Sequence, residues 1–141
     1  MLNRKCSRFI AACAVAATPF VTTAASAEGL DGSSNAVCAV TLVVACTQDG
    51  TCLQGQAKTF DLPELLVLDA KNKVLRATRE SGLKAVSPVK NMEHNGEQLI
   101  LQGVENSRGW DIAINTKTGR MSGSSVGDGV SFLAHGTCTA L

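Results

Sequence analysis

The chain has 141 residues, with 13 basic and 12 acidic side chains and a formal net charge of +1. This balance, without a basic cluster, lacks the electrostatic footprint of a nucleic-acid-binding protein. Beyond the N-terminus, no apolar stretch approaches the roughly 20 residues that a transmembrane helix needs. We therefore expect neither a nucleic-acid partner nor a membrane span.

Residues 1–27 have the composition of a secretory signal peptide. Three basic side chains and no acidic one accompany an apolar run over residues 9–21, and small residues occupy 24–27. This is the order of regions that a signal peptidase substrate shows. Cleavage after Ala27 would leave 114 residues with a net charge of −2. We predict a periplasmic or secreted protein.

The remaining chain has the length of one domain, since domains of roughly 100–150 residues are commonest. Residues 28–35 are rich in glycine, serine, aspartate and asparagine, and we expect them to form a flexible leader. Residues 36–141 then form a single β domain.

Four cysteines remain after cleavage, and an even number in a small exported domain predicts two disulfides. A three-residue loop at 48–50, with glycine in the left-handed position, would place Cys46 opposite Cys52. We therefore predict a Cys46–Cys52 disulfide and, by elimination, a Cys38–Cys138 disulfide.

Short segments of alternating polarity, separated by turn residues, predict an all-β fold. Trp110, Ile112 and Ile114 share one face of such a segment. An Asn-Gly turn at 95–96 would pair Met92 with Leu99. The remaining predicted strands are residues 36–46, 120–126 and 130–140. We predict one antiparallel meander, forming a small β-barrel or half-barrel that a disulfide between its first and last strands closes.

One segment, residues 61–81, fits two structures. A proline in the first turn and a glycine just beyond the last turn would suit a short helix around residues 62–80. The alternative is a hairpin of strands 65–69 and 74–79, joined by a turn at 70–73. We favour the hairpin because the turn residues lie midway between two short apolar runs.

Residues 123–127 match the pattern G-x-S-x-G of serine hydrolases, which would make Ser125 a nucleophile, with Asp128 and His135 following. That chemistry needs a strained turn from a strand into a helix, whereas this segment reads as strand, turn and strand. We therefore expect no enzyme and no catalytic residue, and keep a small serine hydrolase using Ser125 as an alternative.

Metal and cofactor sites have little support in the sequence. His135 precedes Cys138 at H-x2-C spacing, but zinc needs four convergent ligands and no second cluster supplies them. His94 adjoins the predicted Asn-Gly turn, where a solvated side chain is expected. Trp110 is expected to anchor the core, which leaves aliphatic side chains to line any ligand pocket. We predict no metal and no cofactor.

Three pieces carry a resemblance to small exported proteins of Gram-negative bacteria: Cys46-x5-Cys52, residues 110–115 with Thr118-Gly119-Arg120, and Gly136-Thr137-Cys138. The resemblance implies a barrel-like antiparallel sheet. The chain is also similar to periplasmic inhibitors of c-type lysozyme, whose inhibitory loop carries Ser-Gly followed by tyrosine. Ser122-Gly123 is present here without a tyrosine, so no functional residue is carried over.

We expect a non-enzymatic periplasmic or secreted binding or structural module, whose partner is an unknown protein or small-molecule ligand. A lysozyme inhibitor-like protein is the first alternative.

Overall fold

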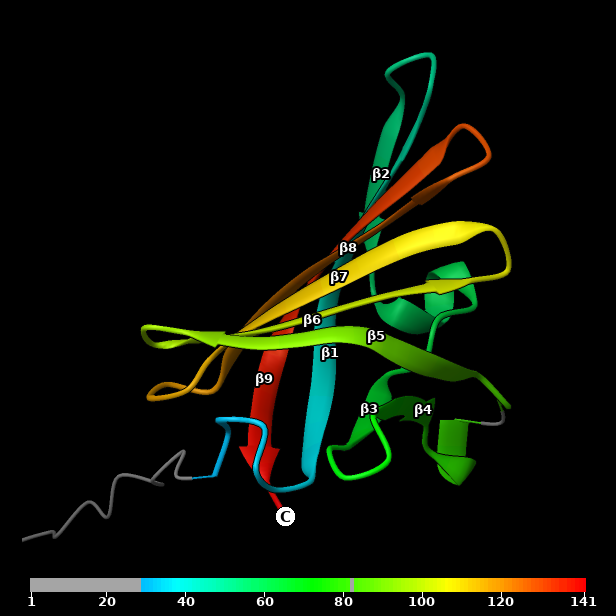
Figure 1. Cartoon of the computed structure of the whole chain (residues 1–141). Coiled ribbons are helices and arrows are strands. Elements are labelled where there is room, and N and C mark those ends of the chain that lie inside the picture. Colours follow the sequence, from blue (N-terminus) through cyan, green and yellow to red (C-terminus); the bar gives the residue numbers. More distant parts are fainter. Residues whose placement is uncertain (1–28, 82) are drawn as a thin grey trace, which may run out of the picture.

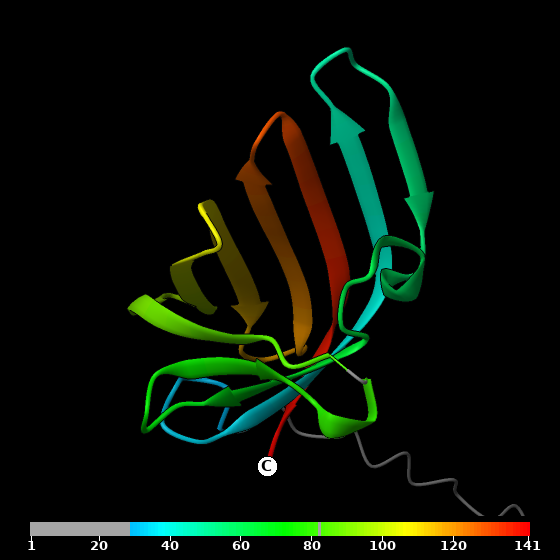
Figure 2. The same cartoon turned by 90° about the vertical axis from the view of Figure 1, so that its right-hand side faces the viewer.

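The computed structural model describes residues 29–81 and 83–141, which form an antiparallel β-barrel (Figures 1 and 2). The predicted signal peptide lies outside the described residues. Nine strands follow one another along the chain: β1 Ala36–Thr47, β2 Cys52–Gly55, β3 Leu65–Asp69, β4 Val74–Ala77, β5 Val86–Asn95, β6 Gln98–Glu105, β7 Arg108–Asn115, β8 Arg120–Gly127 and β9 Val130–Ala140. Two 3-10 turns accompany them, η1 Ala57–Phe60 and η2 Arg79–Ser81.

The barrel closes because β1 pairs with strands on both of its edges. On one edge it pairs with β9 along its whole length. On the other edge its first half pairs with β3 and its second half with β2. Strands β3 to β9 form a meander, so β1 and β3–β9 make a closed barrel of eight strands and β2 is an extra strand. The predicted all-β, antiparallel barrel is confirmed.

Both predicted disulfides are present. Cys46 lies opposite Cys52 at the tip of the β1–β2 hairpin, where Gly50 has the left-handed φ of 86° that the predicted loop requires. Cys38 lies opposite Cys138 in the β1–β9 ladder, and their disulfide joins the first strand to the last. Both halves of this second bridge are buried among the core side chains.

The predicted pairing of Met92 with Leu99 is wrong, because the β5–β6 turn lies one residue further along. His94 pairs with Leu99 and Met92 with Leu101, which leaves Gly96 and Glu97 as the central turn residues. Gly96 has a φ of 60°, as the first central residue of a two-residue hairpin turn can adopt when it is glycine. The register moves by two residues, so the leucines still face the core.

The hairpin that we favoured over residues 61–81 is confirmed, and the short helix around 62–80 is absent. β3 pairs with β4 through the turn at residues 70–73. β4 ends two residues earlier than expected, and η2 follows it. No helix in the described ranges is long and apolar enough to cross a membrane.

The core fills the end of the barrel that holds residues 29–35. Large side chains of β6 and β7 point inward there, among them Leu99, Leu101 and Ile114, each with at most 1% of its surface exposed. The segment predicted as a leader contributes to this core through Leu30, which is also 1% exposed. Asn35 accepts a hydrogen bond from the Ala70 N–H at 3.0 Å. Residues 29–35 therefore form part of the barrel end.

Candidate ligand-binding site

The opposite end of the barrel is hollow. A cavity of about 540 Å³ lies between η1, residues 83–85 and the β6–β7 turn. Figure 1 shows η1 and the β6–β7 turn on its right-hand side. A second cavity of about 190 Å³ lies next to it toward the core. The two cavities share most of their apolar wall. The apolar residues that line both are Leu62, Pro63, Leu66, Leu75, Trp110 and Phe132.

Small inward-facing residues on two adjacent strands contribute to this hollow. On β8 the inward positions run from Met121 in the core to Gly123 and Ser125 at the cavity. On β9 the small Ala134 lines the cavity between Cys138 in the core and Phe132, whose ring is part of the cavity wall. Small barrels are normally filled by side chains, so small residues on adjacent strands leave an unfilled volume.

Trp110 forms the central part of the cavity wall. It lies between Gly103 of β6 and Ser125 of β8 in the ladders, and it packs against the core. Its indole Nε1–H donates a hydrogen bond to Ser87 Oγ at 2.8 Å. Ser87 is buried, so this bond satisfies two polar groups that would otherwise be costly to remove from water. The bond fixes the orientation of the ring at the cavity.

Two phenylalanines extend this aromatic surface toward the mouth. Phe60 of η1 and Phe132 of β9 stand edge to face, with ring centroids 6.2 Å apart and planes at 71°. We expected aliphatic side chains alone to line a pocket, and this expectation is wrong. The cavity gathers the only tryptophan of the chain and two of its four phenylalanines.

Arg108 is the most firmly held cation of the cavity. Its two terminal nitrogens donate hydrogen bonds to the backbone carbonyls of Gly127, at 2.9 Å, and Val130, at 2.8 Å. The guanidinium carbon lies 5.1 Å from the ring centroid of Phe132, a cation–π contact. These contacts place a positive charge beside the apolar wall. Charges of both signs surround it at the mouth, from Asp61, Lys84 and Glu105.

The residues of the possible serine hydrolase do not come together. Ser125 faces the cavity, whereas His135 is exposed on the outer face of the sheet, where its Nδ1 lies 3.2 Å from Ser122 Oγ. Asp128 lies in the β8–β9 turn with a φ of 53°. A general base must lie within hydrogen-bond reach of the proton that it removes, and His135 is on the wrong side of the sheet for Ser125.

Apart from Gly123, which lines the inner cavity, the other sequence candidates lie away from the cavities. Ser122-Gly123, the fragment shared with the lysozyme inhibitors, lies within β8 and not in a loop. His94 is exposed near the end of β5. His135 and Cys138 lie on opposite faces of β9, and Cys138 is held in its disulfide. The described residues contain no group of three metal-ligating side chains close enough to hold an ion.

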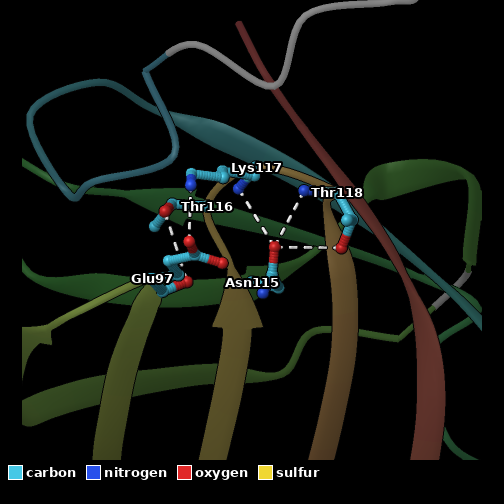
Figure 3. Close-up of polar contacts among 5 residues, drawn as sticks. All are labelled: Glu97, Asn115, Thr116, Lys117 and Thr118. Carbon is cyan, nitrogen blue, oxygen red and sulfur yellow. Dashed lines mark hydrogen bonds and ion pairs between the residues drawn. The ribbon is translucent and has the colours of Figure 1, made fainter.

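The carboxylates whose pKa values are lowered also lie away from the cavity. Figure 3 shows one of them, Glu97, at the filled end of the barrel. The Lys117 ammonium donates a hydrogen bond to this carboxylate and lowers its pKa. Asn115 Oδ1 accepts hydrogen bonds from the backbone N–H of Lys117, at 3.1 Å, and of Thr118, at 2.9 Å. These contacts order the β7–β8 turn.

Arg108, Ser87 and Phe60 were not predicted from the sequence as site residues. The one sequence signal for Arg108 is its position two residues before the segment of alternating polarity at 110–115. Ser87 and Phe60 belong to segments whose position over the barrel end depends on long-range pairing. Comparisons with protein-family models, curated proteins and solved structures find no match to the chain.

Proposed function

We propose that this protein is a non-enzymatic binding protein that takes up an apolar small molecule in the hollow end of its barrel. The observation that carries this proposal is the cavity of about 540 Å³, in which aliphatic and aromatic side chains form most of the wall and Asp61, Lys84, Glu105 and Arg108 supply charges. Small-molecule sites are typically concave, mostly apolar and roughly 300–1,000 Å³ in volume.

The energetics of the site support binding without rearrangement. Removing apolar surface from water contributes about 25 cal/mol per Å², so an apolar ligand that fills the cavity gains affinity from both surfaces. Trp110 is already fixed by its bond to Ser87, and the Cys38–Cys138 disulfide ties the two strands at the barrel seam. A preformed site avoids the entropic cost of ordering on binding.

We also propose that the protein acts in an oxidising compartment, the periplasm or the extracellular space. The two disulfides support this location, because such bonds persist where thiols are not kept reduced. The N-terminal segment supports export as well, because its basic and apolar regions are typical of a secretory signal peptide. The test is the mass of the protein recovered from the medium or a periplasmic extract. A chain that begins at Glu28 without free thiols supports export, and an uncut chain retained in the cytosol contradicts it.

Binding is tested by isothermal titration calorimetry with decan-1-ol, a neutral apolar probe. Leu66 lines both cavities, and Leu66→Trp places a larger side chain in the space that the ligand would use. Its neighbour Leu65 is 38% exposed, so Leu65→Trp is a matched control with the same change of residue.

We expect saturable binding of one decanol to the wild type and to Leu65→Trp, with at least about tenfold weaker binding to Leu66→Trp, a loss of about 1.4 kcal/mol. No measurable heat with the wild type, or equal affinity for all three proteins, would overturn the proposal. Thermal unfolding of each variant shows that the comparison is made between folded proteins.

A further inference from the structure

We infer that the ligand carries a carboxylate, which Arg108 and Ser125 bind at the cavity wall. This inference rests on the proposed function and narrows it from apolar molecules in general to apolar carboxylates. The observations that carry it are the position of the Arg108 guanidinium, its remaining hydrogen-bond donors and the hydroxyl beside it.

The guanidinium is positioned before any ligand arrives. Arg108 donates to the carbonyls of Gly127 and Val130, and its Nε–H points to Ser125 Oγ at 3.4 Å. With Phe132 beneath it, the side chain spans from the start of β7 to the tip of the β8–β9 hairpin. An arginine held in this way loses little side-chain freedom when it binds an anion.

The guanidinium still has capacity to bind. It has five N–H donors, of which three have acceptors among the described residues and two have none. All three acceptors are uncharged. The ion pairs in the described part of the chain join Arg76 to Asp69 and Lys117 to Glu97, and neither includes Arg108. The positive charge of Arg108 is therefore not neutralised by a close carboxylate within these ranges.

A second donor lies beside the guanidinium. Ser125 faces the cavity and accepts the weak bond from Arg108, and its own O–H has no acceptor among the described residues. Two guanidinium N–H groups and one hydroxyl suit the two oxygens of a carboxylate, which accepts hydrogen bonds and donates none. The apolar remainder of such a molecule would lie along Trp110 and the inner cavity.

Other charges face this site. Glu105 lies directly opposite Arg108 across the β6–β7 turn and lines both cavities, without coming within ion-pair distance. Asp61 and Lys84 are exposed at the mouth, where water screens their charges. Asp111 also lines the inner cavity, and its carboxylate accepts a hydrogen bond from Ser124. Glu105 is the carboxylate paired with Arg108 in the ladder, so its removal should make the binding of an anion tighter.

The experiment compares decanoate with decan-1-ol, which share the chain length and differ in the head group, by calorimetry at pH 8. We expect the wild type to bind decanoate about tenfold more tightly than decan-1-ol, since hydrogen bonds to charged groups contribute more than neutral ones.

Arg108→Gln should remove this preference, and Ser125→Ala should reduce it. Glu105→Gln should raise the affinity for decanoate alone. Arg120→Gln, an exposed arginine of β8, is the matched control and should keep the preference.

The outcomes separate this inference from the proposed function. If decan-1-ol does not bind to the wild type, the proposed function fails. If both bind to the wild type with equal affinity, the proposed function stands and the carboxylate inference is wrong. If Arg108→Gln does not fold, Glu105→Gln and Ser125→Ala decide, and unchanged affinity for decanoate in both contradicts the inference.

Discussion

Gly103 and Trp110 face each other in the β6–β7 ladder, and the indole ring of Trp110 occupies the space that a side chain at position 103 would need. A Cβ at Gly103 would overlap two ring atoms and lie 2.7 Å from the Pro88 carbonyl oxygen. The glycine therefore allows the ring to lie flat over β6. From there it reaches Ser87 with its N–H group and the cavity with its face.

Gly103→Ala is expected to destabilise the protein by about 1–3 kcal/mol, as overpacking of a well-packed site does. The measurement is the free energy of unfolding from urea denaturation. Gly109→Ala is the control, because a Cβ at Gly109 would meet no atom within 4 Å. Equal losses in the two variants would mean that the contact with Trp110 does not limit the residue at position 103.

The bond between Trp110 and Ser87 is expected to couple the two residues by about 1 kcal/mol, the typical net contribution of a hydrogen bond. The measurement is a double-mutant cycle of Trp110→Phe and Ser87→Ala, read from urea denaturation. The losses in free energy of unfolding of the two single variants should add up to more than the loss of the double variant, because each single change leaves one partner without its hydrogen bond. If the two single losses add up to the loss of the double variant, the hydrogen bond does not contribute to stability.

The two disulfides are expected to differ in their contribution to stability. The Cys38–Cys138 bond spans 100 residues and the Cys46–Cys52 bond spans 6. The chain-entropy account gives about 4–5 kcal/mol for the long loop and about 2 kcal/mol for the short one. Replacing each pair by alanines and measuring thermal unfolding checks this order. A larger loss on removing the Cys46–Cys52 pair would reverse it.

Leu30→Ala is expected to cost about 2–5 kcal/mol, as other buried leucine truncations do. Leu30 belongs to the segment that composition marked as a flexible leader, yet its side chain is in the core. Leu53→Ala provides the control, because Leu53 is 65% exposed. Similar urea midpoints for Leu30→Ala and the wild type would show that residues 29–35 do not stabilise the barrel end.

Stability is expected to fall in acid through the contact between Glu97 and Lys117. The hydrogen bond from Lys117, and then its charge, lower the pKa of Glu97 from its ordinary value of 4.5. A carboxylate whose pKa is lower in the folded state stabilises it above the unfolded pKa, and this contribution is lost as the pH falls through the folded value.

Urea denaturation between pH 6 and pH 2 measures how the free energy of unfolding falls with pH. Below pH 4.5 this free energy should fall less for Glu97→Gln than for the wild type. Glu93→Gln, which removes an exposed carboxylate of β5 outside the ion pairs of the described residues, should follow the wild type. Parallel curves for the wild type and Glu97→Gln would contradict the prediction.

Much of the fold could be predicted because local turn chemistry and side-chain parity determine it. A glycine in the left-handed position after Asp49 places Cys46 opposite Cys52, and the alternation of β9 places Cys138 inward with Phe132. The β5–β6 register could not be decided in the same way, because Gly96 can be the second central residue of one turn type or the first of another. Tertiary pairing selects the latter.

The cavity could not be predicted, because it depends on which residues meet across strands far apart in the sequence. Gly123, Ser125 and Ala134 are unremarkable as small residues in their own segments. Their effect arises only when the closed barrel brings them together along the wall of one cavity. Arg108 likewise gains its role from carbonyls that lie about 20 residues further along the chain.

The emission of Trp110 tests the central claim most directly. It is the only tryptophan of the chain, which has no tyrosine, and it lines both cavities. If the hollow end binds apolar molecules, titration with decan-1-ol should shift or quench this emission to saturation at one equivalent. Leu65→Trp and Leu66→Trp are unsuitable here because they add a second fluorophore. Emission of the wild type that stays unchanged up to the solubility limit of the alcohol would contradict the claim.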